Sequence, residues 1–133
     1  MCGFAGFIQF QASAADPAAR RRTLAAMGAA IAHRGPDDVQ YHDDGTLALV
    51  FRRLSIIDLQ AGYQPFFNER NDALLVANAE IYNHVELRHQ LEPTCHFRSR
   101  SDCEVLLHGF ERWGAATLSR ASGMFALAHW DMA

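Results

Sequence analysis

Apolar residues gather in short runs separated by polar or glycine-containing stretches, and five of these runs predict buried strands. Gly3 and Gly6, in and beside the first run, permit close backbone approach. The stretch Gly62–Phe67 predicts a loop. The predicted strands are Phe4–Phe10, Thr46–Phe51, Leu54–Leu59, Ala73–Ala77 and Gly123–Trp130.

A helix is predicted to follow the first strand, with Asp16 as the N-cap and Pro17 in the first turn. Apolar residues at helical spacing extend it to about Ala32, and the arginine run 20–22 is expected on its solvated face. The loop-forming stretch 34–38 ends it. The predicted apolar stripe is Leu24, Met27 and Ile31.

Two further helices are predicted, over residues 83–91 and 101–114, each with a glutamate three residues after a capping side chain. Glu86 and Glu104 would complete these capping boxes. The order is strand, helix, several strands, two helices and a strand, with mixed connections. It predicts an α+β sandwich rather than a parallel sheet.

Composition limits the classes of protein that the chain can represent. Its 133 residues suit one globular domain, with half of them hydrophobic and a fifth charged. A net charge of −3 does not favour nucleic acid or an anionic membrane as a partner. No signal peptide or membrane-spanning run is evident, and an odd number of cysteines without CxxC spacing indicates a reducing, cytoplasmic setting. The seven histidines show no ligand spacing, so we expect surface histidines and no metal site.

Cys2 is the first candidate for chemistry. If Met1 is removed, one residue carries both a thiol and an α-amine, whose pKa of about 7.7–8.0 suits a general base. The alternative is a small apolar cysteine at the start of an ordinary strand. These residues alone do not decide between the two.

Charged residues in apolar surroundings provide the other candidates. Arg52 and Arg53 separate two predicted strands, where a buried guanidinium needs a carboxylate partner. For Arg52 the alternative is an edge-strand charge that prevents aggregation. Asp102 opens a predicted helix, where an acid also stabilises the helix dipole.

Five stretches of the chain carry a family resemblance when they are taken together and in order. They are Met1–Phe7, His33–Asp38, Arg52–Leu59, Asn78–Asn83 and Ser101–Leu107, followed by Gly123–Ala126. Together they resemble the class II, N-terminal-nucleophile glutamine amidotransferase domain of asparagine synthetases. The resemblance covers essentially the whole chain, as one domain over residues 1–133. It implies a four-layer αββα sandwich that is incomplete at its C-terminus.

The resemblance assigns roles to individual residues. It implies that Cys2 attacks the side-chain amide of glutamine, while the Asn78 amide and the backbone N–H of Ala79 stabilise the oxyanion. It implies that Arg53 binds the substrate carboxylate and Asp102 its ammonium group. The remaining residues implied to line the glutamine site are Leu54, Ser55, Ile56, Ile57 and Glu80.

One departure from the family concerns the oxyanion residue. The family usually has glycine where this chain has Ala79. An alanine in a left-handed conformation would cost roughly 1 kcal/mol or more. We therefore expect strain there if the backbone is left-handed.

The function implied is the glutaminase half of an asparagine-synthetase-type enzyme, which supplies ammonia for ATP-dependent amide formation, most simply from aspartate to asparagine. Glutamine is the expected substrate, and a C-terminal synthetase domain or a separate ammonia-consuming protein the expected partner. A homodimer is expected for the full-length form. ATP and Mg²⁺ would serve the synthetase domain, and no cofactor is expected in this chain. The alternatives are a truncated, non-catalytic fragment and a relative with another acceptor, in polysaccharide or peptide modification.

Overall fold

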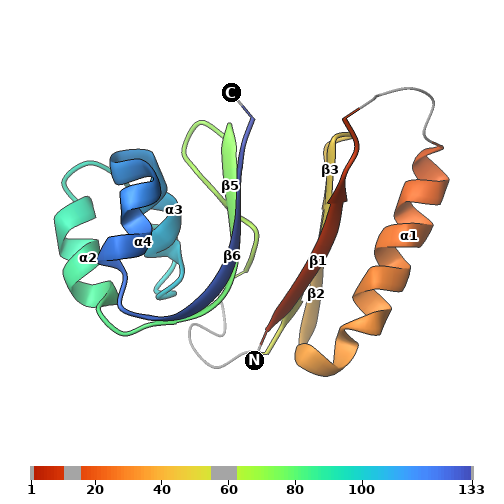
Figure 1. Ribbon diagram of the computed structural model, residues 1–133, viewed down its shortest axis with the longest axis horizontal. Coiled ribbons are helices and arrows are strands. Elements are labelled where there is room, and N and C mark those ends of the chain that lie inside the picture. Colours follow the sequence, from red (N-terminus) through yellow and green to blue (C-terminus); the bar gives the residue numbers. More distant parts are fainter. Residues whose placement is uncertain (1, 11–15, 55–62, 133) are drawn as a thin grey trace. The chain divides into compact units, whose positions relative to one another are not determined.

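The computed structural model describes residues 2–10, 16–54 and 63–132, which divide into two compact units within residues 1–55 and 56–133 (Figure 1). The first unit contains β1 (Gly3–Ile8), α1 (Pro17–Ala30), η1 (Ala32–Arg34), β2 (Asp38–Asp43) and β3 (Leu47–Arg53). The second contains β4 (Phe66–Phe67), β5 (Ala73–Ile81), α2 (His84–Leu91), α3 (Glu104–Trp113), η2 (Gly114–Ala116), α4 (Thr117–Arg120) and β6 (Gly123–Asp131).

The first unit is an antiparallel sheet of order β1-β3-β2, with α1 against one face (Figure 1). Leu24 of α1 is buried with Ala48 and Val50 of β3, and the rest of the predicted stripe packs around them. Asp16 caps the helix as predicted, because its carboxylate accepts the Ala18 N–H at 2.9 Å. The hydrophobic pattern therefore located this helix correctly.

Arg20 departs from the expectation of a solvated arginine run. It is only 7% exposed, and its guanidinium donates to both carboxylate oxygens of Asp43 and to the Gln9 side chain. It also lies 5.0 Å from the centroid of the Phe7 ring. The prediction was wrong for Arg20 because Arg20 lies one turn before Leu24, on the face that meets the sheet.

Two strands of this unit, β2 and β3, differ from the prediction. β2 was not predicted, and β3 runs through Arg52 and Arg53 rather than ending before them. The arginine pair thus ends a strand and does not separate two strands. Of the predicted strand Leu54–Leu59, residues 55–59 lie outside the described part of the chain.

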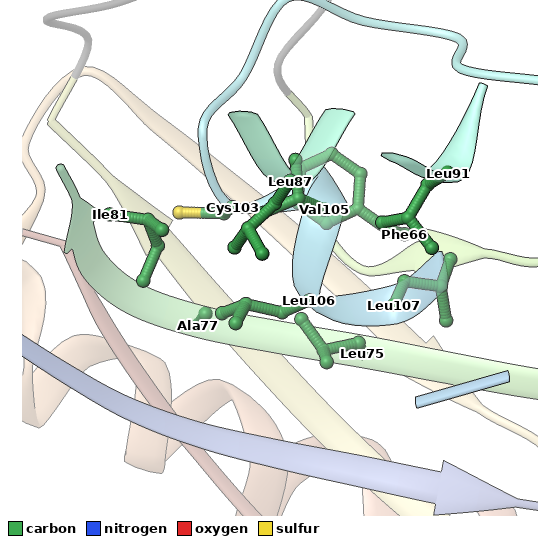
Figure 2. Packing of buried hydrophobic residues seen from close by; sticks show 10 residues of the cluster. All are labelled: Phe66, Leu75, Ala77, Ile81, Leu87, Leu91, Cys103, Val105, Leu106 and Leu107. Carbon is green, nitrogen blue, oxygen red and sulfur yellow. The ribbon is translucent and has the colours of Figure 1, made fainter. Parts of the chain in front are cut away.

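The second unit is an antiparallel sheet of order β4-β5-β6, with its helices on one face (Figure 1). Side chains of β5 interlock with those of α2 and α3 to form its core (Figure 2). β5 continues four residues beyond the predicted strand, through Asn78–Ile81, and β4 lies in the predicted loop. The buried cluster comprises Phe66, Leu75, Ala77, Ile81, Leu87, Leu91, Cys103, Val105, Leu106 and Leu107.

Both capping boxes were predicted wrongly, although the helices are present. Asn83 makes no side-chain cap bond and instead bonds to Arg120 C=O and Ser122 N–H. Helix α3 begins at Glu104, and the Ser101 hydroxyl accepts the Cys103 N–H before the helix starts. The Asn83 side chain is thus used by a segment distant in sequence, whereas Ser101 bonds locally.

His108 also departs from prediction, because it is 3% exposed rather than a surface histidine. Its ring lies 3.6 Å from Glu104 and 3.2 Å from Glu111.

The predicted α+β class of the fold is confirmed. None of the helices described is long and apolar enough to cross a membrane.

Candidate active site

Cys2 immediately precedes β1 and is half-buried beside Leu54, the residue that follows β3. Its Sγ is 3.4 Å from the Leu54 nitrogen and 3.6 Å from the Leu54 carbonyl oxygen. The N–H can donate to a thiolate and stabilise it, whereas the C=O accepts from the protonated thiol. Leu54, one of the predicted site residues, therefore contacts the sulfur through its backbone.

The arginine pair of β3 is held in place on both sides of the strand. β3 is the central strand, so the edge-charge interpretation of Arg52 is wrong, and Arg52 Nε donates to the Gly28 carbonyl at 3.0 Å. Arg53 is 5% exposed, and its carbonyl accepts the Asp37 N–H at 3.1 Å. A Cβ on Gly35 would lie 2.4 Å from the Arg52 carbonyl carbon. The loop 34–38 therefore packs directly against the backbone of the arginine pair.

The hydrogen-bond pattern of β5 determines which backbone groups face the next strand. Tyr82 N–H donates to Ser122 C=O, and Met132 N–H to Asp72 C=O, both at 2.8 Å. In an antiparallel pair such bonded positions alternate, so the even-numbered residues of β5 bond to β6. The odd-numbered residues turn their N–H groups to the opposite edge.

Side chains occupy this opposite edge at regular positions. The Gln64 side chain makes two hydrogen bonds to the Ala77 backbone. It accepts the Ala77 N–H at 2.6 Å and donates to the Ala77 C=O at 3.0 Å. Asp102 Oδ2 accepts the Ile81 N–H at 2.8 Å. For the Ala79 N–H, midway between them, no acceptor occurs among the residues that the structure describes. β5 thus offers one backbone donor at the predicted oxyanion position.

Ala79 lies in extended strand structure and pairs with Phe125. Asn71 alone has a positive φ among the described non-glycine residues, so the strain expected for a left-handed alanine is absent. Asn78, the preceding residue, is half-buried and Glu80 is exposed. The side chains of Asn78 and Glu80 share the face opposite to that of Ala79.

Asp102 is 6% exposed and precedes α3, whereas the sequence predicted it within the helix. Besides its bond to Ile81, its Oδ1 lies 3.6 Å from Cys103 Sγ. A carboxylate has about four acceptor positions, so capacity for a cationic group remains. The explanation of Asp102 as a helix-dipole acid alone is therefore insufficient.

The predicted site residues fall into two sets. Cys2, Arg53 and Leu54 lie together in the first unit, and residues 78–80 with Asp102 lie together in the second. Ser55, Ile56 and Ile57 lie outside the described residues. Gln64 was not predicted, and nothing local in the sequence distinguishes it from an ordinary loop glutamine.

The other two cysteines have surroundings unlike those of Cys2. Burial, with the carboxylates of Glu111 and Glu69, raises the pKa of Cys95 to about 11. Cys103 is buried, and its Sγ contacts the Ala79 carbonyl oxygen and the Asp102 carboxylate. Within residues 2–10, 16–54 and 63–132, no group of three or more metal-ligating side chains is placed to hold a metal ion.

Two antiparallel sheets with helices packed on them define an α+β domain. The chain belongs to the glutamine amidotransferase domain family, whose model matches residues 1–133.

Similar proteins agree with this assignment. The chain is 44% identical to asparagine synthetase [glutamine-hydrolyzing] 2 of Bacillus subtilis, over 98% of this chain and 17% of that protein. It is 34% identical to asparagine synthetase B of Escherichia coli, over 98% of this chain and 23% of that protein. The chain therefore spans about a fifth of the length of these relatives.

A solved structure is similar as well. Glutamine phosphoribosylpyrophosphate amidotransferase of B. subtilis matches with a TM-score of 0.52 and 28% identity, over 66% of this chain and 22% of that one.

Proposed function

We propose that this chain hydrolyses glutamine to glutamate and ammonia through a thioester on Cys2. Removal of Met1 would leave Cys2 with a free α-amine as its general base. The Asn78 amide and the Ala79 N–H would stabilise the oxyanion, Arg53 would bind the α-carboxylate, and Asp102 would bind the α-ammonium group.

The bonds change in two stages. The α-amine takes the thiol proton as sulfur attacks the amide carbon, and the tetrahedral oxyanion forms. The C–N bond then breaks, the nitrogen takes the proton and leaves as ammonia, and a γ-glutamyl thioester remains. Water attacks this thioester, releasing glutamate and returning the proton to sulfur.

The observation that carries the proposal is the edge of β5. There the Ala79 N–H has no acceptor within the described chain, while Gln64 and Asp102 fix the backbone on either side of it. A donor fixed before reaction is what oxyanion stabilisation requires. The carboxylate fixing one side is also the predicted partner of the substrate ammonium.

The ammonia would serve ATP-dependent amide formation, with aspartate as the acceptor, as the names of the relatives suggest. We assign that step, with its ATP and Mg²⁺, to a synthetase domain or partner protein, in the cytoplasm. The family resemblance further supports the proposal of the four-layer αββα fold class and of a homodimer of the full-length form.

Glutamine hydrolysis by purified protein tests the proposal. Cys2→Ala should abolish it. Arg53→Lys and Asp102→Asn should each raise the glutamine KM, because lysine lacks the planar fork and asparagine the charge. Full activity of Cys2→Ala would exclude the thioester, and an unchanged KM in both other variants would exclude the proposed substrate contacts.

A further inference from the structure

Side chains from two helices hold the irregular stretch 97–101, which leads directly into Asp102. Glu104 of α3 accepts the Arg98 N–H at 2.7 Å, the Ser99 N–H at 2.8 Å and the Ser99 hydroxyl at 2.5 Å. Arg88 of α2 donates to the Ser99 carbonyl at 2.9 Å, and its guanidinium lies 3.9 Å from the centroid of the Phe97 ring. The anion thus binds the N–H groups of the stretch and the cation binds its carbonyl.

Glu104 is itself buried, with 3% of the residue exposed. Burial alone would raise its pKa, but the His108 ring 3.6 Å away and the hydrogen bonds from the backbone and hydroxyl of residues 98–99 outweigh that effect, so the pKa is lowered. Glu104 is therefore ionised at neutral pH. A buried charge with this many donors holds its surroundings in a fixed geometry.

The held stretch connects Glu104 to the predicted substrate-binding acid. Ser101 N–H donates to the Ser99 hydroxyl at 3.2 Å, and the Ser101 hydroxyl accepts the Cys103 N–H at 3.2 Å. Asp102 lies between these two residues, with its carboxylate 2.8 Å from the Ile81 nitrogen. Movement of residues 98–101 would therefore move Asp102 away from β5.

We propose that Glu104 is a positioning residue for glutamine selectivity, holding residues 98–101 so that the Asp102 carboxylate is placed to receive the substrate ammonium. This inference rests on the proposed function. The hydrogen bonds of Glu104 go to residues 98 and 99, so its effect on Asp102 passes through the backbone of the stretch 98–101.

Substrate selectivity tests this inference better than activity alone. We compare the glutamine KM with the inhibition constant of 4-carbamoylbutanoate, which is glutamine without its α-amine, and titrate active sites with a glutamine-like diazoketone. Glu104→Gln should raise the glutamine KM about tenfold, the loss of one charged hydrogen bond, and leave the inhibition constant unchanged. If Glu104 served only the stability of the fold, Glu104→Gln would lower the fraction of protein molecules with a titratable active site. The glutamine KM and the inhibition constant would then both stay at wild-type values.

Glu111→Gln is the matched control. It makes the same substitution on the same helix beside the same histidine, but the hydrogen bonds of Glu111 go to His108 and Asn68. Both constants should stay at wild-type values. An equal rise in the glutamine KM in this control would overturn the inference.

Asp102→Asn separates failure of the inference from failure of the proposed function. If it abolishes the preference for glutamine while Glu104→Gln does not, the positioning role is refuted and the proposed role of Asp102 stands. If it keeps the preference, the proposed ammonium contact fails, and the positioning role fails with it. Combined with Asp102→Asn, Glu104→Gln should add no further loss.

Ser99→Ala covers the case in which Glu104→Gln does not fold. It removes the hydroxyl that donates to Glu104 and accepts from Ser101. The glutamine KM should rise by a smaller factor, again with the analogue unaffected. Unchanged selectivity in folded Ser99→Ala would overturn the inference.

Discussion

Replacing Gln64 with leucine tests how the edge of β5 is held. Gln64 is 5% exposed and makes two hydrogen bonds to Ala77, two residues before the predicted oxyanion donor. Leucine has a similar size but neither polar atom, so a buried N–H and a buried C=O would lose their partners. Each such loss costs about 1–3 kcal/mol, and the added apolar contact returns about 1 kcal/mol.

We therefore expect Gln64→Leu to lower the free energy of unfolding by about 1–5 kcal/mol. The assay is urea unfolding followed by tryptophan fluorescence, since Trp113 and Trp130 both lie in the second unit. Gln90→Leu, at an exposed position of α2, is the control and should change stability by less than about 0.5 kcal/mol. If Gln64→Leu lowers the free energy of unfolding by less than about 1 kcal/mol, the two hydrogen bonds between Gln64 and Ala77 do not hold this edge of β5 in place.

Three further predictions concern other parts of the chain. Gly35→Ala should destabilise the protein by about 1–3 kcal/mol in urea unfolding, because its Cβ would press on the Arg52 backbone; wild-type stability would contradict this. The hydrogen bond from Arg20 lowers the pKa of Asp43, so the stability it provides is present above the unfolded pKa of about 3.9 and is lost as pH falls through the folded value. The stability gap between wild type and Asp43→Asn, measured by urea unfolding at successive pH values, should therefore narrow below about pH 4, and a constant gap would exclude the linkage. With a pKa of about 11, Cys95 is on the order of 0.1% thiolate at pH 8, so iodoacetamide should modify it far more slowly than a free peptide thiol; equal rates would show that its surroundings are misjudged.

The sequence predicted the parts of the fold that local patterns determine. The stripe Leu24, Met27 and Ile31 gave α1, and Asp16 with Pro17 gave its start. Apolar runs gave β1 and β6, and the α+β order followed from them.

Contacts outside the local sequence pattern explain the errors. Arg20 is buried because Asp43, more than twenty residues away, supplies its partner. Asn83 and Glu104 look like capping residues, yet their side chains bind segments outside their own helix starts. A capping pattern in the sequence does not show whether the side chain bonds to the start of its own helix or to another segment.

The candidate site was predictable only through resemblance and only residue by residue. The motif around Asn78 indicated an oxyanion role. The extended backbone of Ala79 and the hydrogen bonds of Gln64 to Ala77, however, depend on strand register. Register is a property of the folded sheet, so neither could be read from the sequence.

The most direct test of the central claim is to locate the reactive thiol. Protein treated with a glutamine-like diazoketone is digested and mapped by mass spectrometry, with its N-terminal residue identified in the same experiment. We predict one adduct, on Cys2, in chains from which Met1 is absent. An adduct on Cys95 or Cys103 instead, or full activity in chains that retain Met1, would contradict catalysis by an N-terminal cysteine.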